Sequence, residues 1–198
     1  LENAVVGTDI PLREAALDQG AALRGQEAAA VWARLTLHAD PAIRMAVIQM
    51  LGNQRLPESA RVITAALKDV DADVRAAAVT ALARLGGETA LKPLVSLVAT
   101  AQPADAEMAR ETLRWVAAPD FNATVAAALP GGTASGKQFL LSLLAERNAT
   151  AQRDAVFAEL QSPDADVRKQ ALNTLETVAD GTDVAQVIDV MLKAKSTG

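Results

Sequence analysis

The sequence predicts an all-α protein made of a repeated pair of helices. Alanine, the best helix former, supplies 44 of the 198 residues, while aromatic side chains make up only 3%. Cap-like and apolar residues recur with a period of 31 positions, and the apolar residues are spaced as on one face of a helix. Helix pairs this short cannot bury their apolar faces alone, so about six repeats are expected to stack into a solenoid.

The first helix of each repeat is expected to begin at a side chain that caps it. Carboxylate and hydroxyl oxygens accept hydrogen bonds from the first-turn amides of a helix. Apolar residues follow at helical spacing, as Ile43, Val47 and Leu51 do in one copy. One cap is displaced from the period by three positions, so we expect a local change of stacking in that fourth repeat. The predicted caps are Asp9, Asp40, Asp71, the displaced Asp105, Thr133 and Asp164.

A second helix is expected in each repeat, because one apolar column recurs at intervals of 31. Its members are Trp32, Ile63, Leu94, Val125, Val156 and Val187, and we interpret all of them as core residues. The predicted repeats span residues 9–38, 40–69, 71–101, 105–130, 133–161 and 164–194. They are expected to form a single domain, residues 1–198, of a longer protein.

The clearest copies carry a recognisable pattern. The spacing D-x-x-[VI]-R-x-x-[AV]-[VIL]-x-x-L, which begins at Asp40, Asp71 and Asp164, resembles a HEAT repeat. It is similar to the short bacterial kind that is grouped with the HEAT-like repeats of phycobilisome lyases. The resemblance implies a right-handed α-α superhelix in which the second helices line the concave side. Because HEAT repeats serve many functions, the resemblance predicts the fold better than the activity.

A basic column runs through the repeats at Arg13, Arg44, Arg75, Lys137 and Arg168. Such a column is either a stripe for an anionic ligand or a structural ladder. In HEAT arrays this arginine commonly reaches acidic or carbonyl groups of a neighbouring repeat, so the resemblance favours the ladder. The carboxylates of Asp40, Asp71 and Asp164 are the expected partners. A repeated network of such pairs can set the stacking of the repeats.

The segment from Gly131 to Lys137 spells most of a phosphate-binding loop. Gln138 stands where Ser or Thr would bind magnesium, and the stretch upstream is a predicted helix rather than a strand. Lys137 also belongs to the basic column. We therefore expect the glycines to form the turn into the next helix.

Few groups suit catalysis or metal binding. The chain has no cysteine and one histidine, His38, while a metal site or a general base needs partner groups. The carboxylate pair of Asp71 and Asp73 lies at a predicted helix start, where the helix dipole favours the ionised form. HEAT-like iron hydroxylases carry His-Glu pairs, and this sequence has none. We predict no catalytic, cofactor-binding or metal-binding residue and no cofactor.

The candidates for contact with a partner are outward positions. Arg61, Lys92, Ser96 and Asp154 lie on the outward face of the predicted second helices. Trp115 falls in a mixed column of the displaced repeat. We favour core packing for Trp115, with contact to a partner as the alternative, because exposed tryptophans dominate many interfaces.

These observations predict a non-catalytic protein-interaction or scaffold module of a larger bacterial protein. The net charge of −5 argues against a nucleic-acid partner, and the apolar runs are too short to insert into a membrane. Self-association through the solenoid ends is a further expectation. The resemblance leaves two alternatives, a phycobilin-lyase-like chromophore handler and an accessory arm fused to an extracytoplasmic sugar-active hydrolase. It favours an extracytoplasmic location over a cytoplasmic one.

Overall fold

The computed structural model describes residues 1–23, 25–100, 103–181, 183 and 188, and every regular element in this part of the chain is helical. Two short 3-10 helices, η1 and η2, precede α5 and α11. In chain order the elements are α1 Glu2–Val6, α2 Ile10–Gly20, α3 Gln26–Leu35, α4 Pro41–Gln54, η1 Pro57–Ser59, α5 Ala60–Ala66, α6 Ala72–Leu85, α7 Gly87–Thr100, α8 Pro103–Trp115, α9 Phe121–Ala128, α10 Ala134–Glu146, η2 Thr150–Gln152, α11 Arg153–Glu159 and α12 Ala165–Val178.

The first helices of the repeats follow the predicted period. Helices α2, α4, α6, α8, α10 and α12 begin at residues 10, 41, 72, 103, 134 and 165, each 31 after the one before. Side-chain oxygens accept hydrogen bonds of 2.9–3.1 Å from first-turn amides, which satisfies donors that the helix itself leaves unpaired. These capping side chains are Asp9, Asp40, Asp71, Thr133 and Asp164.

The fourth repeat keeps the same register. Because α8 begins at Pro103, the predicted displacement to Asp105 is wrong. Ala109 and Leu113 lie 31 positions after two core residues of α6, and both are fully buried. Proline suits the first position of a helix, where its missing N–H is not needed. An aspartate inside the first turn resembles a cap in the sequence, which explains the wrong register.

The second helices bury the predicted apolar column. Five of its members lie in α3, α5, α7, α9 and α11, and none is more than 3% exposed. Burial of one such side chain contributes about 1.5–3 kcal/mol. The sixth member, Val187, lies outside the described residues. The buried five are Trp32, Ile63, Leu94, Val125 and Val156.

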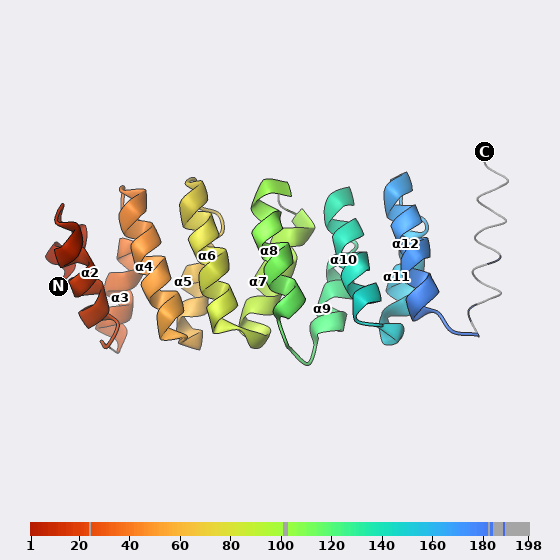
Figure 1. Ribbon diagram of the computed structural model, residues 1–198, viewed down its shortest axis with the longest axis horizontal. Helices are drawn as coiled ribbons and strands as arrows, with labels where there is room; N and C mark the ends of the chain where they lie inside the picture. Colours follow the sequence, from red (N-terminus) through yellow and green to blue (C-terminus); the bar gives the residue numbers. More distant parts are fainter. Residues whose placement is uncertain (24, 101–102, 182, 184–187, 189–198) are drawn as a thin grey trace. The chain divides into compact units, whose positions relative to one another are not determined.

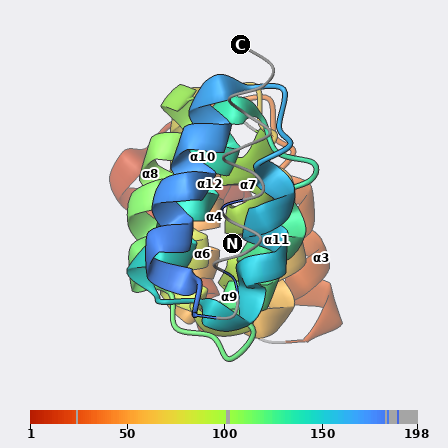
Figure 2. The ribbon, with the colours of Figure 1, turned by 90° about the vertical axis from the view of Figure 1, so that its right-hand side faces the viewer.

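The chain divides into two compact units. The first comprises Leu1–Leu94 and Glu111–Ala117, and the second comprises Val95–Arg110 and the chain from Ala118 onward. Within the first unit, α2, α4 and α6 form one layer and α3 and α5 form the other (Figure 1). Within the second unit, α10 and α12 lie on one side and α9 and α11 on the other (Figure 2). Each unit is therefore a two-layer stack of helix pairs.

Small residues let neighbouring helices approach closely. A Cβ atom added to Gly52 of α4 would lie 2.6 Å from the Cβ of Ala81 in α6. In the second unit, a Cβ atom on Gly136 of α10 would lie 2.5 Å from the carbonyl oxygen of Ala99. Thr133 strengthens that junction, because its amide donates to the same carbonyl at 2.8 Å. These contacts explain why glycine occurs inside α4 and α10.

We predict that Gly136→Ala lowers the free energy of unfolding by about 1–3 kcal/mol, because backbone atoms must move to admit the methyl group. Alanine normally favours a helix over glycine, so a loss of stability has to come from the clash. Gly131→Ala is the control, since a Cβ atom at Gly131 meets nothing within 4 Å. The measurement is urea unfolding of both variants, and equal stability of the two would contradict this account of α10.

Candidate functional site

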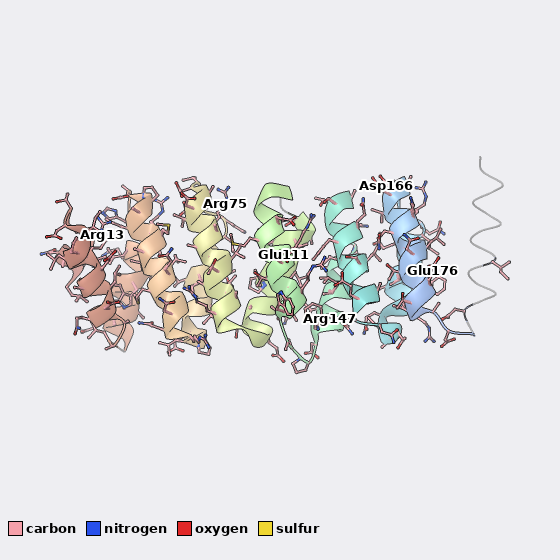
Figure 3. The ribbon with its side chains drawn as sticks, in the orientation of Figure 1. Arg13, Arg75, Glu111, Arg147, Asp166 and Glu176 are labelled. Carbon is pink, nitrogen blue, oxygen red and sulfur yellow. The ribbon has the colours of Figure 1, made fainter. Side chains whose placement is uncertain are left out.

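The arginines of the basic column form a repeated contact that we call the loop clamp: a side chain near the start of a first helix donates to carbonyls of the segment just before that helix. The guanidinium of Arg44 donates to the carbonyl oxygens of His38 and Ala39 at 2.8 and 3.0 Å. Figure 3 labels two other members, Arg13 and Arg75, near the beginning of α2 and α6. The corresponding carbonyl groups belong to Val5 and Gly7 for Arg13, to Asp69 and Val70 for Arg75, and to Ser162 and Pro163 for Arg168.

Arg44 and Lys137 of the basic column form ion pairs. Arg44 pairs with Asp69 at 2.7 Å, and Lys137 pairs with Glu159 at 2.8 Å. Asp69 lies in the loop that Arg75 clamps, so the first pair joins two successive clamped loops. The Arg44 hydrogen bond lowers the pKa of the Asp69 carboxyl below its ordinary value, against the opposing effect of desolvation. The same hydrogen bond raises the pKa of the Arg44 guanidinium.

These acidic partners differ from the expected ones. The carboxylates of Asp40, Asp71 and Asp164 accept hydrogen bonds from amides of their own helices. The ion pairs are made instead by Asp69, three residues after α5, and by Glu159, the last residue of α11. Each capping carboxylate already accepts hydrogen bonds from amides at its helix start. The ion pair with Arg44 or Lys137 is therefore made by an acidic residue at or just after the end of a second helix.

A second column was missed in the sequence. Two residues before three of the capping aspartates, a side chain accepts a hydrogen bond from the backbone amide of the cap. His38 accepts through Nδ1 at 3.0 Å, Asp69 through a carboxylate oxygen at 2.9 Å, and Ser162 through its hydroxyl at 3.4 Å. The 31-residue spacing between His38 and Asp69 is the sequence feature that could have revealed this column. His38 thus has a structural contact in a loop.

The glycine-rich segment forms the start of α10. The hydroxyl of Thr133 accepts from the Gly136 amide at 3.1 Å, and the Lys137 amide donates to the Thr133 carbonyl at 2.8 Å. The Lys137 ammonium forms an ion pair with the Glu159 carboxylate. The amides and the lysine that would bind a phosphate are therefore engaged within the fold.

The predicted contact residues on the second helices are exposed. Arg61 on α5 and Lys92 on α7 belong to the first unit, while Ser96 on α7 and Asp154 on α11 belong to the second. Trp115, the fifth candidate, lies on α8, which is a first helix. The five candidates therefore come from three second helices and one first helix.

Trp115 is solvent-exposed, so the core interpretation of this residue is wrong. Its side chain is 85% exposed at the end of α8. The corrected register explains the difference, because Trp115 now falls in a column that faces solvent. The other described residues at intervals of 31 in this column are all exposed: they are Ala22 and the polar Asn53, Arg84, Glu146 and Thr177.

A hollow of about 340 Å³ adjoins Trp115 within the first unit. Its walls come from the end of α6, the turn into α7 and the end of α8. Gly86 and Gly87 form that turn with positive φ values of 69° and 54°, a conformation that glycine adopts readily. We call this region the Trp115 surface; its residues are Ala83, Gly86, Gly87, Thr112, Trp115, Val116 and Ala117.

A second surface feature lies on the second-helix layer of the same unit. A cleft of about 340 Å³ lies between α3 and α5, and its lining is mostly apolar. Leu23, at 49% exposure, stands at the cleft and the indole of Trp32 contributes to its wall. Glu58 and Ser59 supply polar groups there. The cleft therefore offers an apolar surface with few groups for chemistry.

Metal clusters and membrane spans are two further kinds of site that the described part of the chain lacks. No cluster of three or more His, Cys, Asp or Glu side chains there is arranged to hold a metal ion. None of the described helices combines the length and apolar character needed to cross a bilayer.

Comparison with known proteins relates the chain to helical repeats. A family model described as HEAT repeats matches residues 28–114. No curated protein matches the sequence. Because the 31-residue helix pair extends through both units, the matched model and the structure agree on a HEAT-like repeat.

Solved structures of two engineered proteins resemble the chain in fold. The first is 19% identical, with a TM-score of 0.50, and the match covers 89% of this chain and 94% of that one. The second is also 19% identical, with a TM-score of 0.51, covering 98% of this chain and 60% of that one. A structure of human deoxyhypusine hydroxylase in complex with glycerol is 15% identical over 93% of this chain and 85% of that one; its TM-score of 0.39 is too low to support an argument. Such a repeat fold fits a scaffold or an interaction module.

We predict that Asp69→Asn destabilises the protein at neutral pH and that the difference from the wild type disappears in acid. The folded-state pKa of Asp69 is lowered from 3.8, so its contribution is present above that value and is lost as the pH falls through the folded-state pKa. Urea unfolding between about pH 3 and pH 7 measures the effect. Glu58→Gln, on the surface of η1, is the control. A difference that persists unchanged at the acid end would contradict the ionic role of Asp69.

We also predict that the two tryptophans differ sharply in fluorescence. Trp115 should emit at long wavelength and be quenched by iodide, because it is 85% exposed, whereas Trp32 is 3% exposed. Trp115→Phe should therefore remove the long-wavelength emission and most of the iodide quenching. If the variant is quenched as strongly as the wild type, Trp115 is not the exposed tryptophan.

Proposed function

Because the chain is a HEAT-like α-solenoid, we propose that it is a non-catalytic module that binds another protein through the Trp115 surface. The observation that carries the proposal is an exposed tryptophan in a solvent-facing column whose other described members are Ala22 and four polar residues. Burial of a large apolar side chain contributes about 1.5–3 kcal/mol, and Trp115 leaves that contribution largely unused in its own unit. A partner that covers the indole would recover it.

The surroundings of Trp115 suit a protein contact. Tryptophan is enriched among the residues that contribute most to interfaces, and such residues pair with pockets. The adjoining hollow has walls of alanine, valine and glycine, so an apolar side chain of a partner fits beside the indole. The loop clamps and close glycine contacts hold the helix pairs in place, which reduces the entropy lost on binding.

The engaged titratable groups support a non-catalytic role. Aspartates that the sequence places at helix starts act as caps, and the basic column holds loops. His38 accepts a hydrogen bond from the backbone amide of Asp40. These groups contribute to the fold, so we assign the function to surface shape rather than to chemistry.

The context of the module stays a prediction. An extracytoplasmic location, an accessory arm beside a sugar-active hydrolase domain and chromophore handling are all compatible with a helical repeat. A chromophore would fit best in the apolar cleft of about 340 Å³ between α3 and α5, so a chromophore-handling role is tested there. An unchanged bilin absorption spectrum on addition of the protein would remove that alternative.

The test compares three immobilised forms of the chain: wild type, Trp115→Ala and Arg84→Ala. Arg84 occupies the same column in α6, so its variant controls for a change on an exposed helix surface. We expect a protein from the source cells to be retained by the wild type and Arg84→Ala and lost from Trp115→Ala. With that protein purified, Trp115→Ala should weaken binding about 30-fold or more, which corresponds to a loss of about 2 kcal/mol.

Circular dichroism melting should give closely similar curves for the three forms, because both substituted side chains are exposed. Retention of the same proteins on all three forms, or equal affinity of the purified partner for the wild type and Trp115→Ala, would refute the assignment to the Trp115 surface.

A further inference from the structure

Two segments of the second unit share a motif that the interaction role does not use. Asn122-Ala123-Thr124 and Asn148-Ala149-Thr150 both match Asn-x-Thr, the acceptor sequence for N-linked glycans. Each asparagine also has an acidic residue two positions before it, Asp120 and Glu146. The sequence alone treats the two segments alike, but the structure separates them.

The Asn148 segment is a tight turn at the surface. Asn148 has a φ of 49°, in the left-handed region that asparagine tolerates, and its side chain is exposed. Ala149 has φ −79° and ψ 59°, and the Thr150 amide donates to the Asn148 carbonyl at 2.9 Å. These values describe an inverse γ-turn. The turn brings the exposed Asn148 and Thr150 together as neighbours on one compact loop.

The turn is held by groups other than the two motif side chains. Ala149 is 2% exposed, and its amide donates to the Leu144 carbonyl at 3.0 Å. The Asn148 amide donates to the Ala145 carbonyl at 2.9 Å. The backbone therefore fixes the loop, and an enzyme can take the Asn148 side chain without unfolding its support.

The Asn122 segment lies in a helix. Asn122 and Thr124 belong to α9, and the Thr124 amide makes a helical hydrogen bond to the Asp120 carbonyl at 2.9 Å. Residues two apart on a helix point to different sides, so the amide and the hydroxyl are not presented together. The Asn122 side-chain oxygen is buried. Modification of Asn122 would require α9 to open.

We propose that Asn148 is an acceptor site for an N-linked glycan in the folded chain and that Asn122 is not. In the reaction the Asn148 amide nitrogen attacks the anomeric carbon of an oligosaccharide carried on a lipid pyrophosphate. The N–C bond forms as the C–O bond to the pyrophosphate breaks. The lipid pyrophosphate leaves with the bonding electrons, and the amide nitrogen gives one proton to the transferase. The site lies in the other unit from Trp115, so the two proposals can fail separately.

The experiment incubates the purified, folded chain with a single-subunit oligosaccharyltransferase and a lipid-linked oligosaccharide. Intact mass and peptide mapping report the glycan. Two synthetic peptides, residues 118–126 and 144–152, serve as unfolded controls. We expect both peptides to be modified, whereas occupancy in the folded chain should be at least about tenfold higher at Asn148 than at Asn122, because a half-buried site inside a helix must open first.

Matched variants test the motif without disturbing the turn. Thr150→Ala should abolish the modification and Thr150→Ser should retain it, while both keep Asn148 in its left-handed conformation. An unmodified folded chain, equal occupancy of the two asparagines, a modified Thr150→Ala variant, or failure of the peptide 144–152 to accept the glycan would each overturn the proposal.

Discussion

Each helix pair must bury its apolar stripes against the next pair, and this constraint governs the rest of the structure. A helix of ten to fourteen residues is only marginally stable in isolation, so its stability comes from packing against the neighbouring helices. The fully buried Ile63, Val125 and Val156 show where that burial occurs. Close stacking then requires small residues at the junctions, as the contact of Gly52 with Ala81 illustrates. The high alanine content thus serves packing distance as well as helix propensity.

Stacking also depends on well-ordered turns, and the loop clamp provides them. A loop of three to five residues between helices exposes carbonyl groups that need donors. Arg44 supplies donors to its own loop and a salt bridge to Asp69, whose carbonyl is in turn held by Arg75. The result is a chain of contacts along one edge of the first unit. The basic column is accordingly committed to structure, which leaves function to other residues.

Function is best sought where one residue departs from its column. Trp115 occupies a place that other repeats fill with alanine or polar side chains, and the first unit offers no packing reason for it. The turn at Asn148 repeats the left-handed conformation of Arg55, three periods earlier, so what is particular to Asn148 is the Asn-x-Thr sequence at that turn. In a repeat protein the column supplies the expected residue at each position, so a departure that packing does not explain is informative.

The sequence by itself determined the period, five of the capping residues and the five described members of the buried column of the second helices, because each depends on contacts within a few residues or on strict repetition. The tertiary structure decided the start of α8, where Pro103 and Asp105 are both plausible helix-start residues in the sequence. It also decided the acidic partner of Arg44, since cap oxygens are already engaged by amides and only the packed loops bring Asp69 near. The exposure of Trp115 and the difference between Asn122 and Asn148 follow from the same cause: a side chain's surroundings depend on which helix lies beside it.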